Sequence, residues 1–324
     1  MKIVLESSAL IYASEFPDEL KAQFPDVEFV TPQTPEELRR VIRDADGIYG
    51  TPDREAFAAA ERLRWIAHPG VGFDYVMDRP DIVESDVVLT PARAPGYDPH
   101  GNGLGDHVFG MILMLAHRWP DLLADQRAHR WGAGNYNNQY VELTGRTMGI
   151  LAVGAIGSAV ARRARGFDMR VIGVDKKTSP VPEGVDEVWG LERLDEALSV
   201  SDWFVIAAPR TPETLGLVDA RRLSLMKKGA YLIAISRGGI VDEEALLKTL
   251  RSGHLAGAGL DVFAQEPLPE DSPLWDQENV IISPHTGHVT PEMPKGHRDV
   301  FKDNLRRFIA GEPFLYVGDK RTGY

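Results

Sequence analysis

The stretch TMGILAVGAIGSAVARR, residues 147–163, decides the fold class of this chain. It starts with an apolar run typical of a buried strand, passes through Gly154-Ala155-Ile156-Gly157, and continues with the residue spacing of a helix. A second apolar run follows at residues 170–175 and closes with Asp175. Strand, glycine-rich turn, helix and strand in this order predict a βαβ unit of a parallel sheet.

The glycines and the acid of this unit are suited to binding a dinucleotide. Gly154 lets the backbone approach a pyrophosphate, Gly157 lets the helix pack on the strand, and the helix N-terminus attracts negative charge. Asp175 can accept hydrogen bonds from ribose hydroxyls and would repel a 2′-phosphate, which favours NAD over NADP. The two lysines that follow Asp175 partly offset that repulsion, and Ala152 stands where the usual fingerprint has its first glycine.

Strand-like and helix-like patterns alternate on both sides of this unit. Strands are predicted at residues 3–5, 27–30, 47–49, 65–67 and 87–90, and again at residues 148–153, 170–175, 203–208, 231–236, 257–263 and 280–284. The fold class is therefore α/β, with two doubly wound parallel-sheet domains. Two helices, at residues 106–118 and 295–310, are expected where the chain crosses between the domains, so that residues 1–98 and 290–324 form one domain and residues 99–289 the other.

Composition excludes several classes of function. The formal charge of −12 over 324 residues argues against a nucleic-acid partner, because phosphate binding needs an excess of lysine and arginine. The chain has no cysteine, which excludes disulfides, thiolate nucleophiles and cysteine-ligated metals, and no metal site is expected. No apolar run suits a signal peptide or a membrane span, so a cytoplasmic protein without a membrane partner is expected.

Three successive strands of the second series are each followed by polar residues suited to acid–base or carboxylate chemistry. Arg237 follows the strand at residues 231–236, Asp261 and Glu266 belong to the next strand and its loop, and His285 follows the last strand. Ligands of open α/β sheets bind beyond the carboxyl ends of the strands. Each residue alone could be a solvated loop side chain, but three in succession indicate a catalytic set.

These residues also carry a resemblance. The sequences SRGGIVD at residues 236–242 and GAGLDVF at residues 257–263, together with Glu266-Pro267 and Pro284-His285, resemble the D-isomer-specific 2-hydroxyacid dehydrogenases over nearly the whole chain. The resemblance implies a Rossmann NAD-binding domain beside a flavodoxin-like substrate domain. It also implies hydride transfer between nicotinamide and C2 of a small 2-oxo or 2-hydroxy acid, most simply of the glyoxylate or hydroxypyruvate type.

The resemblance assigns roles to individual residues. Arg237 would bind the substrate, His285 would donate or accept the proton, and Glu266 would be its partner. The implied cofactor-binding residues are Gly154, Ala155, Ile156, Gly157, Asp175, Pro209, Thr214, Ile235, Ser236, Asp261, His285 and Gly287, with Asp261 on the nicotinamide carboxamide. The implied substrate-binding residues are Gly70, Val71 and Gly72, which would grip a carboxylate through backbone N–H groups, with Arg237, His288 and Arg93.

Some segments depart from the family pattern. The stretch at residues 92–105 is longer than in the family and carries Arg93, Tyr97, His100 and Asn102, which are expected to border the substrate. His288 stands where the family often has a small residue. Asp106-His107 is interpreted as capping charge at a helix start. The remaining histidines, His68, His117, His129 and His254, are interpreted as surface or packing residues.

Alternatives to a 2-hydroxyacid dehydrogenase stay open. The same arginine, glutamate and histidine could oxidise another small anion, as in phosphite dehydrogenase. Formate dehydrogenases are disfavoured because they have glutamine where Glu266 stands. An NAD-sensing interaction protein resembling the C-terminal-binding-protein corepressors would keep the same three residues without catalysis. The resemblance further implies a homodimer built around the helix at residues 106–118 and the aromatic loop that follows.

Overall fold

A computed structural model describes residues 1–10, 14–93 and 101–323. The chain divides into two compact units. Unit 1 comprises Met1–Pro99 and Thr290–Tyr324, and unit 2 comprises His100–Val289.

The described residues of unit 2 form a seven-stranded parallel sheet in the order β12-β11-β10-β9-β6-β7-β8. The strands are β6 (Thr147–Leu151), β7 (Arg170–Val174), β8 (Glu187–Trp189), β9 (Trp203–Ile206), β10 (Tyr231–Ala234), β11 (Gly257–Leu260) and β12 (Val280–Ile282). The sequence predicts six of them. It misses β8, an edge strand whose three residues include one that is exposed and one that is half-buried, because so short a strand with a partly solvated face shows no hydrophobic run.

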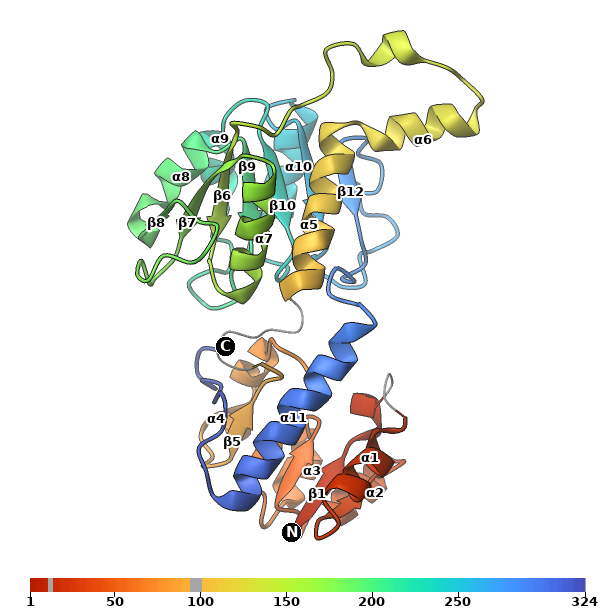
Figure 1. Ribbon diagram of the computed structural model, residues 1–324, viewed down its shortest axis with the longest axis vertical. Coiled ribbons are helices and arrows are strands. Elements are labelled where there is room, and N and C mark those ends of the chain that lie inside the picture. The colour runs from red at the N-terminus through yellow and green to blue at the C-terminus, as the bar shows by residue number, and fades with distance from the viewer. Residues whose placement is uncertain (11–13, 94–100, 324) are drawn as a thin grey trace. The chain divides into compact units, whose positions relative to one another are not determined.

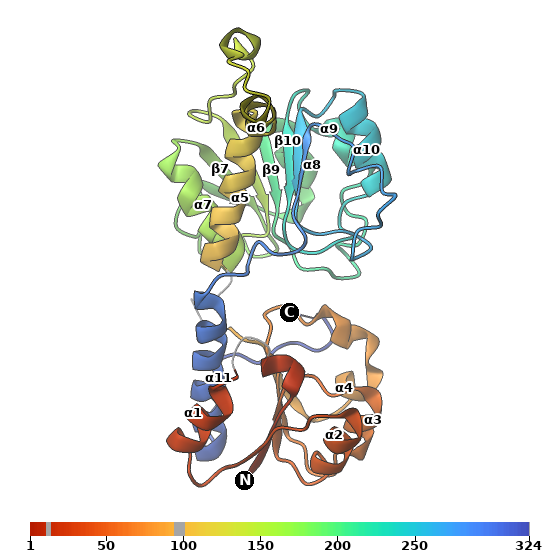
Figure 2. The same ribbon diagram turned by 90° about the vertical axis from the view of Figure 1, so that its right-hand side faces the viewer.

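Helices cover both faces of this sheet (Figures 1 and 2). One face carries α5 (Gly101–Ala116) and α7 (Ala155–Gly166), and the other carries α8 (Leu194–Val200), α9 (Ala220–Leu225) and α10 (Glu243–Arg251). The prediction that this helix begins at Asp106 is wrong, because the described part of α5 already includes Gly101. Leu104 is buried in the core between α5 and the sheet, and this packing overrides the poor helix propensity of the neighbouring glycines.

After α5 the chain leaves the body of unit 2 before it returns to β6 (Figure 1). This excursion contains α6 (Trp119–Arg127) and a short 3-10 helix, η3 (Ala133–Tyr136), where the sequence analysis expects only an aromatic loop after the helix. The Trp131 side chain is 94% exposed, and Trp119 and Tyr140 are also exposed.

Unit 1 is built on a five-stranded parallel sheet in the order β2-β1-β3-β4-β5. The strands are β1 (Lys2–Leu5), β2 (Glu28–Val30), β3 (Gly47–Tyr49), β4 (Trp65–Ala67) and β5 (Val88–Thr90). α1 (Phe16–Gln23) and α11 (Glu292–Ala310) pack on one face, and α2 (Pro35–Val41), α3 (Arg54–Ala59) and α4 (Pro80–Val83) pack on the other. The remaining short 3-10 helices are η1 (Ser7–Leu10) and η2 (Asp74–Asp78) in unit 1 and η4 (Leu191–Arg193) in unit 2.

The carboxy-terminal helix α11 completes the core of unit 1. The Phe301 ring stacks on the Trp65 ring of β4, with centroids 5.4 Å apart and planes 9° from parallel. Gly311 ends the helix in a left-handed conformation at φ 69°, as the sequence predicts. The two sheets confirm the predicted α/β class with two parallel-sheet units. None of the helices in the described part of the chain combines the length and apolar character that a bilayer-spanning helix requires.

Candidate active site

The polar residues singled out in the sequence lie at one edge of the sheet of unit 2. β10, β11 and β12 are adjacent and parallel, so the loops that follow them leave from the same edge. Arg237 comes after β10, Glu266 after β11 and His285 after β12. The topology therefore brings three segments that are distant in sequence to one place.

His285 and Glu266 are hydrogen-bonded to each other at this edge. His285 Nδ1 lies 2.7 Å from Glu266 Oε2, and Glu266 Oε1 accepts a hydrogen bond of 2.9 Å from the Phe263 backbone N–H. A carboxylate at Nδ1 keeps a proton on that nitrogen, because a carboxylate can only accept. Nε2 is therefore the imidazole atom that can gain or lose a proton, and Glu266 fixes the orientation of the ring.

Arg237 and His288 belong to the same electrostatic environment. The His285 and His288 ring centroids lie 5.8 Å apart, with the rings edge to face. Burial lowers the pKa of His288, His285 and Arg237 lower it further, and the Asp261 carboxylate opposes them. Arg237 Nη1 donates a hydrogen bond of 2.9 Å to the Ser236 carbonyl. The structure thus places one guanidinium and two imidazoles within each other's electrostatic influence.

Asp261 lies under the loop that carries His285. Its side chain is fully buried and accepts hydrogen bonds from Ser283 Oγ at 2.6 Å, from the Thr286 N–H at 2.9 Å and from the Gly287 N–H at 3.1 Å. A buried carboxylate needs such donors to replace its lost hydration. Asp261 therefore organises the loop that carries His285, a role separate from the nicotinamide contact that the family resemblance implies.

The two glycines of the turn after β6, Gly154 and Gly157, have different roles. A Cβ on Gly157 would lie 2.1 Å from the Ala152 carbonyl oxygen, so this glycine permits the close approach of α7 to the strand. A Cβ on Gly154 would meet no atom within 4 Å, so packing does not require glycine there. Ala152 has φ 70°, the left-handed conformation that explains why glycine usually occupies its position.

Asp175 lies over this turn. One of its oxygens accepts a hydrogen bond of 3.0 Å from the Val153 N–H, and the other accepts one of 3.0 Å from the Lys177 N–H. The Lys176 ammonium lies 3.5 Å from Glu213. The carboxylate is thus held beside the turn, and an acid on another loop partly balances the lysine charge that follows it.

The remaining predicted cofactor residues lie at the same edge. Ala155 and Ile156 supply the first N–H groups of α7, which have no carbonyl partner within a helix. Thr214 Oγ1 donates to the Pro209 carbonyl at 2.7 Å and shapes the loop after β9. Ile235 and Ser236 are buried after β10, and Gly287 is bound to Asp261.

These residues fit a bound dinucleotide. Ser236 Oγ is a buried hydroxyl for which the described residues offer no hydrogen-bond partner. Buried hydroxyls without partners are rare, and a ligand is one way to satisfy them. With the open space above Gly154 and the free helix N-terminus, the edge offers what a pyrophosphate and a ribose require.

The predicted carboxylate-binding turn lies in unit 1. Gly70, Val71 and Gly72 are half-buried after β4, and the Gly70 carbonyl accepts a hydrogen bond of 2.9 Å from the Ala92 N–H. Arg93 follows directly, and its guanidinium stacks over the Tyr316 ring at 3.8 Å. Of the other residues in this stretch, Tyr97 and His100 lie outside the described residues, whereas Asn102 belongs to α5.

His68 corrects the interpretation of the other histidines as surface or packing residues. Its Nδ1 lies 3.0 Å from both Thr51 Oγ1 and Tyr75 OH, and these two hydroxyls are 2.7 Å apart. A Cβ on Gly70 would lie 2.8 Å from His68 Nε2. His68 therefore belongs to a hydrogen-bonded cluster beside the glycine turn. Sequence spacing gave no sign of it, because Thr51 follows β3, whereas His68 follows β4 and Tyr75 belongs to η2.

The capping interpretation of Asp106-His107 is also wrong. α5 already includes Gly101, so neither residue is at its start. Asp106 forms an ion pair with Arg163 of α7 at 2.7 Å. His107 Nε2 instead lies 2.8 Å from Ser283 Oγ, after β12. Sequence reasoning missed this contact because it joins residues that lie far apart in the chain.

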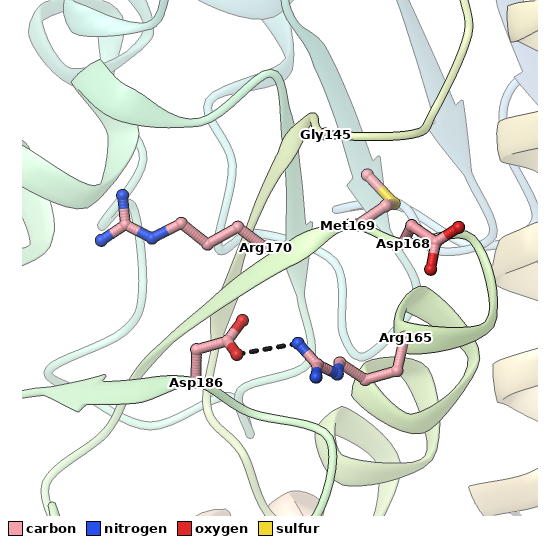
Figure 3. Close-up of a pocket in the computed structure, with 6 residues that line it drawn as sticks. All are labelled: Gly145, Arg165, Asp168, Met169, Arg170 and Asp186. Carbon is pink, nitrogen blue, oxygen red and sulfur yellow. Dashed lines mark hydrogen bonds and ion pairs between the residues drawn. The ribbon is translucent and has the colours of Figure 1, made fainter.

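A surface hollow of about 510 Å³ lies at the opposite edge of the sheet, where β6, β7 and β8 begin. Gly145, Arg165, Asp168, Met169, Arg170 and Asp186 line it (Figure 3). The Arg165 guanidinium points at the Asp186 carboxylate at 2.8 Å, and Arg170 pairs with Glu187 at 2.7 Å. Both arginines that line the hollow are thus paired with acids, and the hollow is not part of the candidate site. Within the described residues, no three histidine or acidic side chains are grouped to hold a metal ion.

The fold and this site are those of a nucleotide-binding oxidoreductase, and comparison with known proteins identifies the family. Residues 109–287 match the description "D-isomer specific 2-hydroxyacid dehydrogenase, NAD binding domain". A glyoxylate reductase from Thermococcus onnurineus is 36% identical, covering 86% of this chain and 84% of its own length. A D-3-phosphoglycerate dehydrogenase from Methanocaldococcus jannaschii is 33% identical over 89% of this chain, but the chain spans only about half of that relative, 54%.

A solved structure agrees over the whole chain. The D-isomer specific 2-hydroxyacid dehydrogenase from Xanthobacter autotrophicus, in complex with NADPH and MES, superposes with a TM-score of 0.83 at 31% identity, covering 99% of each chain. The chain therefore belongs to the D-isomer-specific 2-hydroxyacid dehydrogenases, a family of oxidoreductases, and carries the family's NAD-binding domain. The resemblance found in the sequence is confirmed.

Proposed function

We propose that this protein is an NAD(H)-dependent reductase of a small 2-oxo acid, D-specific, with glyoxylate or hydroxypyruvate as the substrate type. One observation carries the proposal: a histidine oriented by a carboxylate lies with an arginine at the carboxyl edge of a nucleotide-binding sheet. The glyoxylate reductase relatives support the substrate type.

His285 supplies the proton in this proposal. The bound reduced nicotinamide supplies a hydride to C2 of the 2-oxo acid. Negative charge that builds on the carbonyl oxygen is then met by the proton on His285 Nε2, which yields the 2-hydroxy acid. Glu266 accepts a hydrogen bond from Nδ1 at 2.7 Å and so keeps the ring oriented with Nε2 as the atom that transfers the proton.

Arg237 binds and polarises the substrate. A guanidinium keeps its charge at all working pH values and presents several N–H donors in one plane, so it can meet both a carboxylate and a carbonyl oxygen. In unit 1, Gly70, Val71 and Gly72 are a proposed carboxylate-binding turn that would act through backbone N–H groups, and Arg93 follows Ala92, which is hydrogen-bonded to this turn. His288, whose pKa is lowered by burial, would offer a hydrogen bond to the substrate.

The preferred cofactor in this proposal is NAD(H). Asp175 is held beside the glycine turn, where it would accept from ribose hydroxyls and repel a 2′-phosphate. We expect Asp175→Ala to weaken NADH binding about tenfold and NADPH binding much less, so that the ratio of the two dissociation constants moves toward NADPH. Fluorescence titration of the purified variant with each cofactor measures this. An equal loss for both would mean that Asp175 does not select the cofactor.

A panel of acids tests the reaction itself. Purified protein is expected to oxidise NADH with glyoxylate, hydroxypyruvate or a related 2-oxo acid. The loss of absorbance at the nicotinamide band measures this oxidation. Parallel reactions use NADPH in place of NADH and, in the oxidative direction, NAD with phosphite, formate and D-2-hydroxy acids. Turnover of phosphite alone would assign the same three residues to another anion. NADH binding without turnover of any acid would favour a nucleotide sensor.

We further propose a homodimer built around α5 and the aromatic segment that follows it, which includes α6. The exposed Trp119, Trp131 and Tyr140 support this, because large exposed aromatic groups mark association surfaces. Light scattering that gives a single-chain mass would refute it.

A further inference from the structure

We propose that His107 is a positioning residue for His285 and that it acts through Ser283 and Asp261. The inference rests on the proposed function, because it concerns how the proton donor is held. His107 lies on α5, and the other two residues lie after β12 and β11. A chain of hydrogen bonds therefore connects a helix on one face of the sheet to the loop that carries His285.

The hydrogen bonds have a fixed direction. Asp261 is a carboxylate acceptor, so Ser283 Oγ donates its only proton to Asp261 Oδ1 at 2.6 Å. The Ser283 oxygen must then accept from His107 Nε2 at 2.8 Å. His107 consequently carries its proton on Nε2, and a side chain without a donor at that place cannot replace it.

Asp261 fastens the loop on both sides of His285. It binds Ser283, two residues before His285, and the N–H groups of Thr286 and Gly287, just after it. His285 itself has φ 55°, in the left-handed region that residues other than glycine rarely adopt. Such a conformation persists only where the surroundings fix it, and the Asp261 network provides that constraint.

α5 is a firm support for this network. Val108, Met111 and Ile112 of α5 are buried, and a Cβ on Gly259 of β11 would lie 2.8 Å from Met111 Sδ. The His107 ring also packs closely on the loop, since a Cβ on Gly287 would lie 2.8 Å from His107 Cδ2. The imidazole thus contributes both volume and a donor, and the test must separate these contributions.

Two substitutions of similar size make that separation. His107→Gln keeps an N–H donor near the Nε2 position, whereas His107→Leu fills the space without a donor. We expect His107→Leu to lower kcat for the 2-oxo acid about tenfold, with KM and NADH affinity changed less than about threefold, because a misplaced proton donor slows the chemical step rather than binding. His107→Gln is expected to recover kcat to within about threefold of the wild type.

Ser283→Ala removes the middle of the chain of hydrogen bonds. It is expected to lower kcat as much as His107→Leu does, and the double variant is expected to be no slower than the slower single variant, because both interrupt one pathway. His254→Ala is the matched control, since His254 Nε2 also makes a hydrogen bond, to the Met226 carbonyl at 2.9 Å, but far from His285 in the fold of unit 2. It should leave kcat unchanged. Thermal unfolding of each variant identifies those that do not fold, and Ser283→Ala then remains as the smallest change.

Three results would overturn the inference: wild-type kcat in His107→Leu, equal losses in His107→Gln and His107→Leu, or additive losses in the double variant. His285→Ala is measured beside them. If His285→Ala keeps wild-type turnover, the proposed function itself fails. If His285→Ala is inactive while His107→Leu is fully active, only the positioning role of His107 fails.

Discussion

His285→Ala is expected to lower the turnover of a 2-oxo acid by roughly 10²- to 10⁴-fold while NADH affinity stays nearly unchanged. The variant removes the group proposed to protonate the carbonyl oxygen, and water is a much poorer acid at neutral pH. Asp261 and the backbone of the His285 loop stay in place, because their hydrogen bonds do not involve the imidazole. Steady-state kinetics and fluorescence titration with NADH measure the two quantities.

His117→Ala is a suitable control for this experiment. The His117 ring packs against the Tyr140 ring, with centroids 5.3 Å apart, and the residue lies just beyond the end of α5. Its loss should leave turnover unchanged. Full turnover in His285→Ala would remove His285 from the mechanism, and a parallel loss of NADH affinity would show that the imidazole supports cofactor binding instead.

Arg237→Ala is expected to lower kcat/KM for the 2-oxo acid by about 10³-fold or more. Loss of one donor to a developing oxyanion alone costs about 10²- to 10³-fold in rate, and the charge on the substrate carboxylate also loses its partner. Arg237→Lys keeps the charge but lacks the planar guanidinium. Its kcat/KM is expected to be about tenfold higher than that of Arg237→Ala. The measurement is kcat/KM under the same conditions for both variants.

An exposed arginine elsewhere in unit 2 provides the comparison. Arg251 lies in the last turn of α10. The loop after β10, which carries Arg237, leads into the opposite end of that helix. Arg251→Ala should have wild-type kcat/KM. If Arg237→Ala retains more than about a tenth of wild-type kcat/KM, the proposed contact with the substrate oxygen is wrong.

The strands and the fold class could be predicted because they depend on local patterns. Buried parallel strands read as apolar runs, and each run at the sheet centre was long enough to recognise. Errors occurred where local signals were weak: β8 has three residues at a sheet edge, and the first turn of α5 contains glycines that helix propensity disfavours. In α5, burial of Leu104 decided the outcome, and burial is a property of the folded chain.

The candidate site divides in the same way. Arg237, Glu266 and His285 could be found from the sequence because each follows a recognisable strand, and parallel strands end at one edge. The contact of His107 with Ser283 and the cluster of His68 with Thr51 and Tyr75 could not, since these pairs share no spacing in the chain. Resemblance to a family does not supply such contacts either, because it concerns motifs rather than the packing around them.

The sequence by itself determined the strand order along the chain, the glycine turn with its acid, and which polar residues follow the strands. Only the tertiary structure decided which side chains touch: that Glu266 binds His285 through Nδ1, that Asp261 holds the loop on both sides of His285, and that α5 reaches this loop. The physical reason is the distance, along the chain or in space, over which each kind of interaction acts. Hydrophobic periodicity and turn chemistry act between residues that are neighbours in sequence, whereas hydrogen bonds act over about 3 Å in space and join whichever groups the packed helices and sheets bring together.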